Sequence, residues 1–129
     1  MRWNLEVVPV MVSDVDRAKK FYAEQVGFHV DLDVEVSEQL RIVQLTPPGS
    51  GTSIQLKQGD TRLDGLQVVV DDVDAARDEL VERGVDVSAV AHFEGGVRRE
   101  GRGGDWNSFV FFVDPDGNAW VIQERPSSS

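Results

Sequence analysis

The sequence predicts an α+β fold built from two tandem βαβββ modules. The segment VSDVDRAKKFY at residues 12–22 returns as VDDVDAARDEL at residues 70–80. Internal similarity of this kind indicates one supersecondary unit used twice. An apolar, β-branched run precedes each copy, and further strand-like runs follow it, interrupted by the turn sequences PPGSG and DPDG.

The elements of the first module follow from its residue pattern. LEVVPVMV at residues 5–12 is apolar and β-branched, which predicts a buried strand. Ser13 precedes the acidic start DVD, so we expect it to cap a helix that Gly27 ends. The alternation in FHVDLDVEV at residues 28–36 predicts a half-buried strand. QLRIVQLT and TSIQLKQ supply two further strands.

The second module repeats this order. Asp71 takes the capping position and Gly84 ends the helix. VDVSAVA, SFVFFV and AWVIQE are the expected strands after the helix. Between the first two of them lies EGGVRREGRGGDW at residues 94–106, whose five glycines predict an irregular, mobile loop.

The chain length sets the expected domain organisation. With 129 residues it is the size of one domain. We expect that domain to cover residues 1–125, with module one at 1–58 and module two at 63–125. Residues 126–129, with the sequence PSSS, are expected to form a flexible tail.

Composition excludes several classes of partner. The formal net charge of −10 argues against nucleic acid and against anionic membranes, because both repel an acidic surface. The absence of cysteine excludes disulfides and thiolate metal sites, and suits a reducing cytoplasm. The sequence offers neither a signal-peptide core nor an apolar run long enough to span a bilayer.

The duplicated helix start SDVDRAKKFY, the tandem βαβββ pattern and DPDGNAW before the last strand resemble the vicinal oxygen chelate superfamily. This family includes glyoxalase I, bleomycin-resistance proteins and extradiol dioxygenases. The resemblance implies an open, U-shaped, eight-stranded mixed sheet whose concave faces hold the ligand. It also implies a homodimer. Family enzymes usually bind one divalent cation there, which acts as a Lewis acid.

The ligand positions implied by the resemblance can be compared with this sequence. They fall on Val7 and Gln55 in the first module, and on Gly65 and Val121 in the second. Valine and glycine side chains cannot coordinate a cation, and one neutral amide holds it weakly. We therefore expect no metal and no cofactor.

Three glutamines remain as candidate ligand-binding residues. Gln67 and Gln123 each lie two residues beyond an implied metal position, and so share its strand face. With Gln55 they would direct three amides into one cavity, which suits hydrogen bonding to a neutral polar ligand. The alternative is that these amides satisfy one another or water.

Other candidates each have a structural alternative. His92 is a general base at the cavity mouth or a partly buried structural histidine. Arg98 and Arg99 belong either to a lid over an anionic ligand or to a solvated loop. Trp106 and Phe112 either share the concave face and stack on a planar ligand, or pack in the core. His29, beside three acidic residues of its strand, is expected on a solvated face.

The sequence thus predicts a protein that binds a small organic molecule in a metal-free concave cavity. The alternative is a metal-dependent lyase, isomerase or dioxygenase with non-standard ligands, or a metal-free catalyst that uses His92 or a loop arginine. A third alternative is a protein that binds a protein partner or serves as a structural dimer.

Overall fold

The structure, a computed structural model, describes residues 1–127, so the last two residues of the expected tail lie outside the described residues. Its contacts divide the chain into two units. The first is Met1–Leu63 together with Asp114–Gly117, and the second is Asp64–Val113 together with the chain from Asn118 onward. Each unit contains one sheet and one helical segment.

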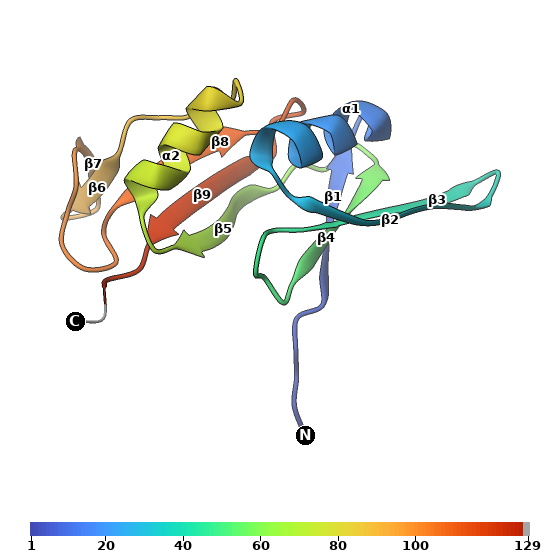
Figure 1. The fold of residues 1–129 in the computed structure, drawn as a ribbon, viewed down its shortest axis with the longest axis horizontal. Helices are drawn as coiled ribbons and strands as arrows, with labels where there is room; N and C mark the ends of the chain where they lie inside the picture. The colour runs from blue at the N-terminus through green and yellow to red at the C-terminus, as the bar shows by residue number, and fades with distance from the viewer. Residues whose placement is uncertain (128–129) are drawn as a thin grey trace. The chain divides into compact units, whose positions relative to one another are not determined.

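The sheet of the first unit has four strands in the order β1-β4-β3-β2. They are β1 (Val7–Val12), β2 (His29–Ser37), β3 (Leu40–Thr46) and β4 (Ser53–Gln58). β1 pairs with β4 in parallel, and the other neighbours are antiparallel. This is the predicted βαβββ order, and Figure 1 shows β2 and β3 continuing as a long hairpin.

The helix of the first unit begins one residue later than expected. α1 (Val15–Lys20) continues as a π-helical segment, η1 (Phe21–Val26), and Gly27 ends it with φ = 90°. The N-cap is Asp14, whose carboxylate accepts a hydrogen bond from the Arg17 amide. Ser13 is therefore not the cap, because its side chain is bound elsewhere.

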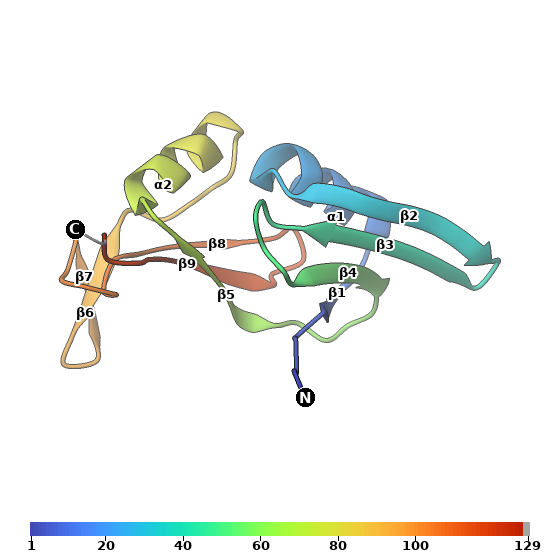
Figure 2. The same ribbon diagram turned by 60° about the horizontal axis from the view of Figure 1, so that its bottom comes forward.

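One face of this sheet is buried beneath the helix. The buried side chains come from alternate positions of three strands and from the helix: Val10, Val12, Ala18, Tyr22, Val43, Leu45 and Leu56. β2 departs from the predicted half-buried strand, since Leu32, Val34 and Val36 are 37%, 47% and 58% exposed. β2 is an edge strand, and the β2–β3 hairpin extends past the end of β4 (Figures 1 and 2), so its apolar side chains have no layer to pack against.

The second unit has a five-stranded sheet in the order β5-β9-β8-β6-β7. Its elements are β5 (Asp64–Val70), α2 (Val73–Glu82), β6 (Ala91–Glu94), β7 (Val97–Glu100), β8 (Phe109–Val113) and β9 (Ala119–Glu124). The helix is capped by Asp72, which binds the Ala75 amide, and not by the expected Asp71. Val73, Leu80, Val110, Trp120 and Ile122 form the core.

Two predictions for this unit are wrong. VDVSAVA is not a strand except at Ala91, and part of the segment expected to be an irregular loop forms the β6–β7 hairpin. Gly95 and Gly96 both have positive φ, which matches the two-residue turns that close β-hairpins. With this extra strand, the described residues form one sheet of four strands and one of five, and a single sheet of eight strands is not confirmed. Neither described helix is long and apolar enough to cross a membrane.

Candidate functional site

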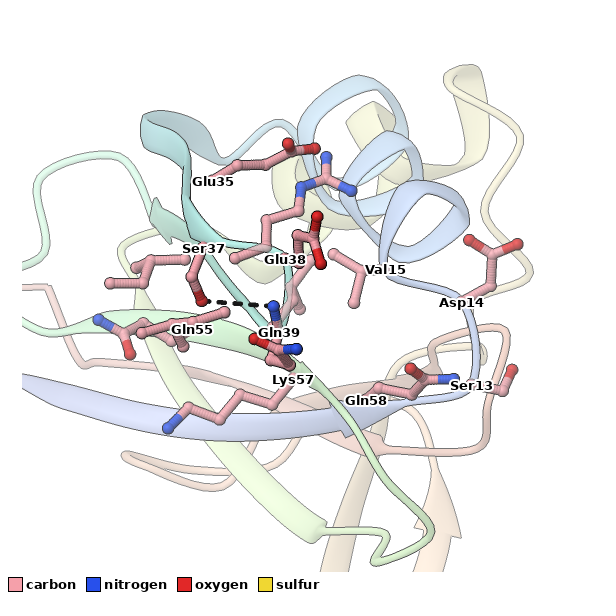
Figure 3. Close-up of a pocket in the computed structure, with 14 residues that line it drawn as sticks. Ser13, Asp14, Val15, Glu35, Ser37, Glu38, Gln39, Gln55, Lys57 and Gln58 are labelled. Carbon is pink, nitrogen blue, oxygen red and sulfur yellow. Dashed lines mark hydrogen bonds between the residues drawn. The ribbon is translucent and has the colours of Figure 1, made fainter.

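A cavity of about 940 Å³ lies within the first unit. It is lined by the start of α1, the tip of the β2–β3 hairpin and the end of β4. Figure 3 shows Gln55, Lys57 and Gln58 on β4, with Glu35, Ser37 and Glu38 on the hairpin. The lining combines amides, hydroxyls, charges and the apolar side chains of Val15, Leu40, Ile42 and Leu56.

The cavity exists because two neighbouring strands diverge. β3 pairs with β4 only over Val43–Leu45 and Ile54–Leu56. Before that point, Leu40–Ile42 stays paired with β2, while Lys57 and Gln58 stay paired with β1. The space between the separated strand ends is the cavity, which two non-adjacent stretches of sequence therefore line.

Arg41 holds the hairpin wall in place. Its guanidinium lies 2.8 Å from Asp16 and 2.8 Å from Asp33, and Lys19 lies 2.7 Å from Asp33. Hydrogen bonds from Arg41 and then from Lys19 hold the pKa of Asp33 well below its usual range. The hydrogen bonds from Asp33 and Asp16 raise the pKa of Arg41. The positive charge of Arg41 is therefore already compensated.

Other charged groups at the cavity are uncompensated. Glu35, Glu38 and Lys57 line it, and none of them takes part in an ion pair with another described residue. Gln55 donates to the Gln44 side-chain oxygen at 3.0 Å, which fixes its amide and leaves its own carbonyl oxygen as an acceptor. The cavity thus presents negative and positive charges to a ligand, together with amides that can donate or accept hydrogen bonds.

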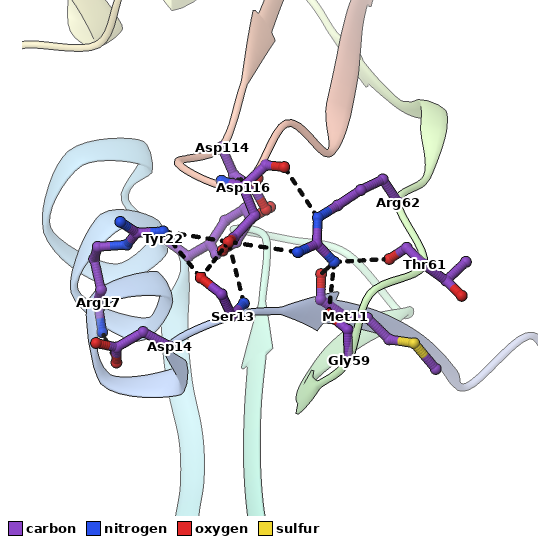
Figure 4. A network of polar contacts seen from close by, with 10 residues as sticks. All are labelled: Met11, Ser13, Asp14, Arg17, Tyr22, Gly59, Thr61, Arg62, Asp114 and Asp116. Carbon is purple, nitrogen blue, oxygen red and sulfur yellow. Dashed lines mark hydrogen bonds and ion pairs between the residues drawn. The ribbon is translucent and has the colours of Figure 1, made fainter.

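A polar network fixes the α1 end of the cavity, where Ser13 lies (Figure 4). The Ser13 hydroxyl and amide both donate to Asp116, at 2.5 Å and 3.1 Å, and Arg17 lies 3.2 Å from the same oxygen. Arg62 donates to the Asp116 carbonyl oxygen and to the carbonyl oxygens of Met11, Gly59 and Thr61. These contacts join the linker between β4 and β5, residues 59–63, to the turn Asp114–Gly117 and to the start of α1 within one unit.

Asp116 is ionised in this network. Its side chain is only 4% exposed, and burial by itself raises the pKa of a carboxyl. The hydrogen bonds from Ser13 and the charges of Arg17 and Arg62 outweigh that effect, so that the net pKa of Asp116 lies below its ordinary value. Asp114 beside it accepts a 2.7 Å hydrogen bond from Tyr22.

The three candidate glutamines belong to different units. Gln55 lines the cavity of the first unit, whereas Gln67 and Gln123 lie on β5 and β9 of the second. Gln67 donates to Gln123 at 2.6 Å, and Gln123 donates to the Trp106 carbonyl oxygen at 2.8 Å. Each of the three glutamines therefore has a hydrogen-bond partner within the protein.

The second unit carries an aromatic group on the sheet face opposite its core. Phe93, Phe109 and Phe111 contact one another, with ring centroids 5.4–6.4 Å apart. The Arg98 guanidinium lies 4.2 Å from the centre of the Phe111 ring, a cation–π distance. Sequence reasoning did not select these phenylalanines, although the alternation of β8 already placed Phe109 and Phe111 on one face.

Trp106 and Phe112 do not occupy equivalent positions. Trp106 is 51% exposed and has a positive φ of 61°, an uncommon conformation for a bulky residue. Phe112 is buried and stacks on Trp120, with ring centroids 5.9 Å apart. Phe112 packs in the core, as the second of its two interpretations has it, because its strand parity places it beside Val110.

His92 lies on β6 and has only 13% of its side chain exposed. Its Nδ1 lies 2.8 Å from the Gly101 carbonyl oxygen and its Nε2 lies 3.0 Å from the Glu94 carboxylate. Because both partners are acceptors, the doubly protonated ring is favoured, and the hydrogen bond with Glu94 raises the pKa of His92. Arg99 pairs with His92 across the hairpin and is exposed. His29 is exposed, as expected.

The side chains do not fit a divalent cation. Within residues 1–127, no group of three or more histidine, cysteine, aspartate and glutamate side chains could hold a metal ion. The positions implied by the family resemblance carry Val7, Gln55, Gly65 and Val121, which together provide one neutral amide.

Comparisons with known proteins give a consistent picture. The family model described as Glyoxalase/Bleomycin resistance protein/Dioxygenase superfamily matches residues 5–122. The chain is similar to TnmS3, an antibiotic binding protein from Streptomyces sp. CB03234, with 31% identity, a TM-score of 0.77, and coverage of 97% of this chain and 98% of TnmS3.

Two further relatives cover most of the chain. A glyoxalase/bleomycin resistance protein from the same Streptomyces strain is 32% identical, with a TM-score of 0.73 and coverage of 93% of this chain and 99% of its own. The uncharacterized protein YetH of Bacillus subtilis (strain 168) is 25% identical over 127 residues, covering 94% of this chain and 98% of YetH.

Proposed function

Because the chain belongs to the Glyoxalase/Bleomycin resistance protein/Dioxygenase superfamily, we propose that it binds a small organic molecule without the help of a metal ion. The ligand lies in the cavity of the first unit. One fold of this kind hosts many sites, so the proposal depends on the side chains that line the cavity and not on the fold alone.

The cavity itself is the observation that carries the proposal. Its volume of about 940 Å³ is at the upper end of the size typical of small-molecule sites. Gln55 is fixed in it by Gln44, while Glu35, Glu38 and Lys57 have no ion-pair partner among the described residues. Fixed amides and free charges beside apolar side chains are what orients a polar organic ligand.

The similarity to TnmS3 supports binding without turnover. TnmS3 is an antibiotic binding protein, and it is 31% identical to this chain over nearly its full length. We propose a ligand of antibiotic size that is held and released unchanged. None of the candidate residues of the second unit lines this cavity. We propose that they contact ligand on the second unit by itself: Gln67, Gln123, Trp106, His92, Arg98 and Arg99.

We also propose that the protein acts as a homodimer in the cytoplasm. The apolar side chains of Leu32, Val34 and Val36 on β2 are exposed in the single chain, which favours burial against a partner. Light scattering after size-exclusion chromatography measures this directly, and a mass of one chain, 14.3 kDa, at micromolar concentration would contradict it.

The binding proposal is tested on protein treated with chelator. A diverse small-molecule library is screened by amide chemical shifts, with and without added manganese, iron, nickel or zinc. We expect metal-independent binders that shift the Gln55, Lys57 and Gln58 signals. The substitution Gln55→Leu should weaken the affinity of these compounds about tenfold, since one hydrogen bond to the ligand is lost. Gln25→Leu, a glutamine of the same unit outside the cavity lining, is the matched control.

Two results would contradict the proposal. Binding that appears only with a stoichiometric divalent ion would favour the enzyme alternative with non-standard ligands. Conversion of a bound compound into product would exclude a protein that only holds its ligand.

A further inference from the structure

Two strand edges face the cavity of the first unit without hydrogen-bonding partners on that side. On β3, Leu40–Ile42 pairs with β2 but not with β4. On β4, Lys57 and Gln58 pair with β1 but not with β3. All of these residues line the cavity, and Figure 3 shows Lys57 and Gln58 of β4 among them. The cavity therefore lies where the ladder between β3 and β4 has stopped.

Free main-chain groups of a strand are a template for another extended chain. Backbone N–H and C=O groups in a shielded place need partners, and strand addition supplies them in a regular pattern. The register of β3 and β4 ends at the pair Val43 and Leu56, and the strands then separate, so a short chain can add where their pairing stops. The separation is local, which limits the addition to a few residues.

We propose that the cavity of the first unit takes a short, extended, peptide-like ligand whose main-chain amides hydrogen-bond to the free edges of β3 and β4. This inference rests on the proposed function and specifies the class of ligand. Gln39 and Gln58, which also line the cavity, add side-chain amides that pair with a peptide backbone equally well.

The side chains around the free edges indicate the preferred sequence. Successive side chains of an extended chain point to opposite sides. Leu40 and Ile42 offer apolar contacts, while Glu35 and Glu38 are carboxylates without an ion-pair partner among the described residues. A peptide that alternates apolar and basic residues satisfies both, and the net charge of −10 favours its approach.

The competing account is that water satisfies both edges. Charged side chains on an edge strand oppose strand addition, and Lys57 is such a residue. The two accounts differ in what they require of the ligand backbone. Strand addition needs the N–H groups of the peptide, whereas a ligand held only by its side chains does not.

The experiment uses the full chain and a defined probe, the blocked tetrapeptide Ac-Lys-Val-Lys-Val-NH2. Its counterpart with N-methyl groups on two alternate amides keeps every side chain and loses two donors. We expect the parent to shift the amide signals of Leu40–Ile42, Lys57 and Gln58, and N-methylation to weaken binding about tenfold or more. Ac-Glu-Val-Glu-Val-NH2 should bind less tightly than the parent.

Variants locate the contact. The double substitution Glu35→Gln and Glu38→Gln should weaken binding of the basic peptide. Glu24 is a carboxylate on η1 outside the cavity lining, so Glu24→Gln should leave that binding unchanged. Equal binding of the parent and the N-methylated peptide would overturn the proposal, as would shifts confined to other strands. If library compounds bind at Gln55 while no peptide does, the ligand class is wrong and the binding function stands. If neither binds there, both fail.

Discussion

Ser13 and Asp116, which lie 103 residues apart in the sequence, are joined by two hydrogen bonds to a single carboxylate oxygen. Arg17 and Arg62 lie 3.2 Å and 3.6 Å from the same oxygen. The contact fixes the start of α1, from which Ser13, Asp14 and Val15 reach the cavity. A turn encoded near the end of the chain therefore shapes a site built mainly by its first half.

Replacing Asp116 tests the strength of this contact. Asp116→Ala removes the acceptor of two Ser13 hydrogen bonds and the charge partner of two arginines, while exposed Ser13 and Arg17 can still bind water. The free energy of unfolding should therefore fall by about 1–2 kcal/mol. Urea denaturation followed by circular dichroism measures the change. Asp60→Ala, an exposed aspartate of the linker, should change stability by less than about 0.5 kcal/mol. Equal effects of both variants would contradict the assignment.

Ionisation of Asp116 should make the free energy of unfolding depend on pH. The folded state holds the pKa of Asp116 below its ordinary value, so its contribution is present above the unfolded pKa. That contribution is lost as pH falls through the folded pKa. The unfolding free energy of the wild type should therefore fall more steeply below pH ~4 than that of Asp116→Asn. Parallel pH profiles would show that Asp116 is not held ionised.

The stability that His92 contributes should depend on pH in the opposite sense to that of Asp116. Its hydrogen bond with Glu94, supported by that with the Gly101 carbonyl oxygen, raises its pKa above 6.5, although Arg99 across the hairpin opposes this. The stability that it contributes is present below the unfolded pKa and is lost as pH rises through the folded pKa. Proton NMR measures the pKa of His92, and Glu94→Gln should lower it. An unchanged value in that variant would contradict the pairing.

Replacing Gly27 at the end of the helical segment should lower stability. Its φ of 90° is costly for a residue with a Cβ, so Gly27→Ala should lower the free energy of unfolding by about 1–2 kcal/mol. Gly51→Ala is the matched control, because Gly51 does not have positive φ and an added Cβ there meets nothing within 4 Å. Thermal unfolding monitored for both variants distinguishes them, and a neutral Gly27→Ala would contradict this role.

Local patterns were sufficient for much of the fold. The duplicated segment predicted both modules, and Gly27 and Gly84 end their helices as expected. Capping was misplaced by one residue in each module, because serine and aspartate are similarly good caps and only the structure shows which side chain reaches the amide. The prediction of an irregular loop at residues 94–106 was wrong in part, because Gly95 and Gly96 form the turn of a β-hairpin there.

The site was less predictable for a physical reason. Gln55 could be selected from its position, and it does line the cavity. The cavity, however, results from the divergence of β3 from β4, which depends on where interstrand pairing stops. Alternation in β2 correctly indicated two faces, but it cannot tell a covered face from one that extends beyond the rest of the sheet. The contact between Ser13 and Asp116 left no local signal at all.

The most direct test of the central claim is a titration of chelator-treated protein with the best compound from the library screen, followed by calorimetry and by amide chemical shifts in one sample. The account predicts saturable one-site binding that divalent ions do not change, with shifts centred on Gln55, Lys57 and Gln58. Binding that requires a stoichiometric metal ion, or shifts that avoid this cavity, would contradict it.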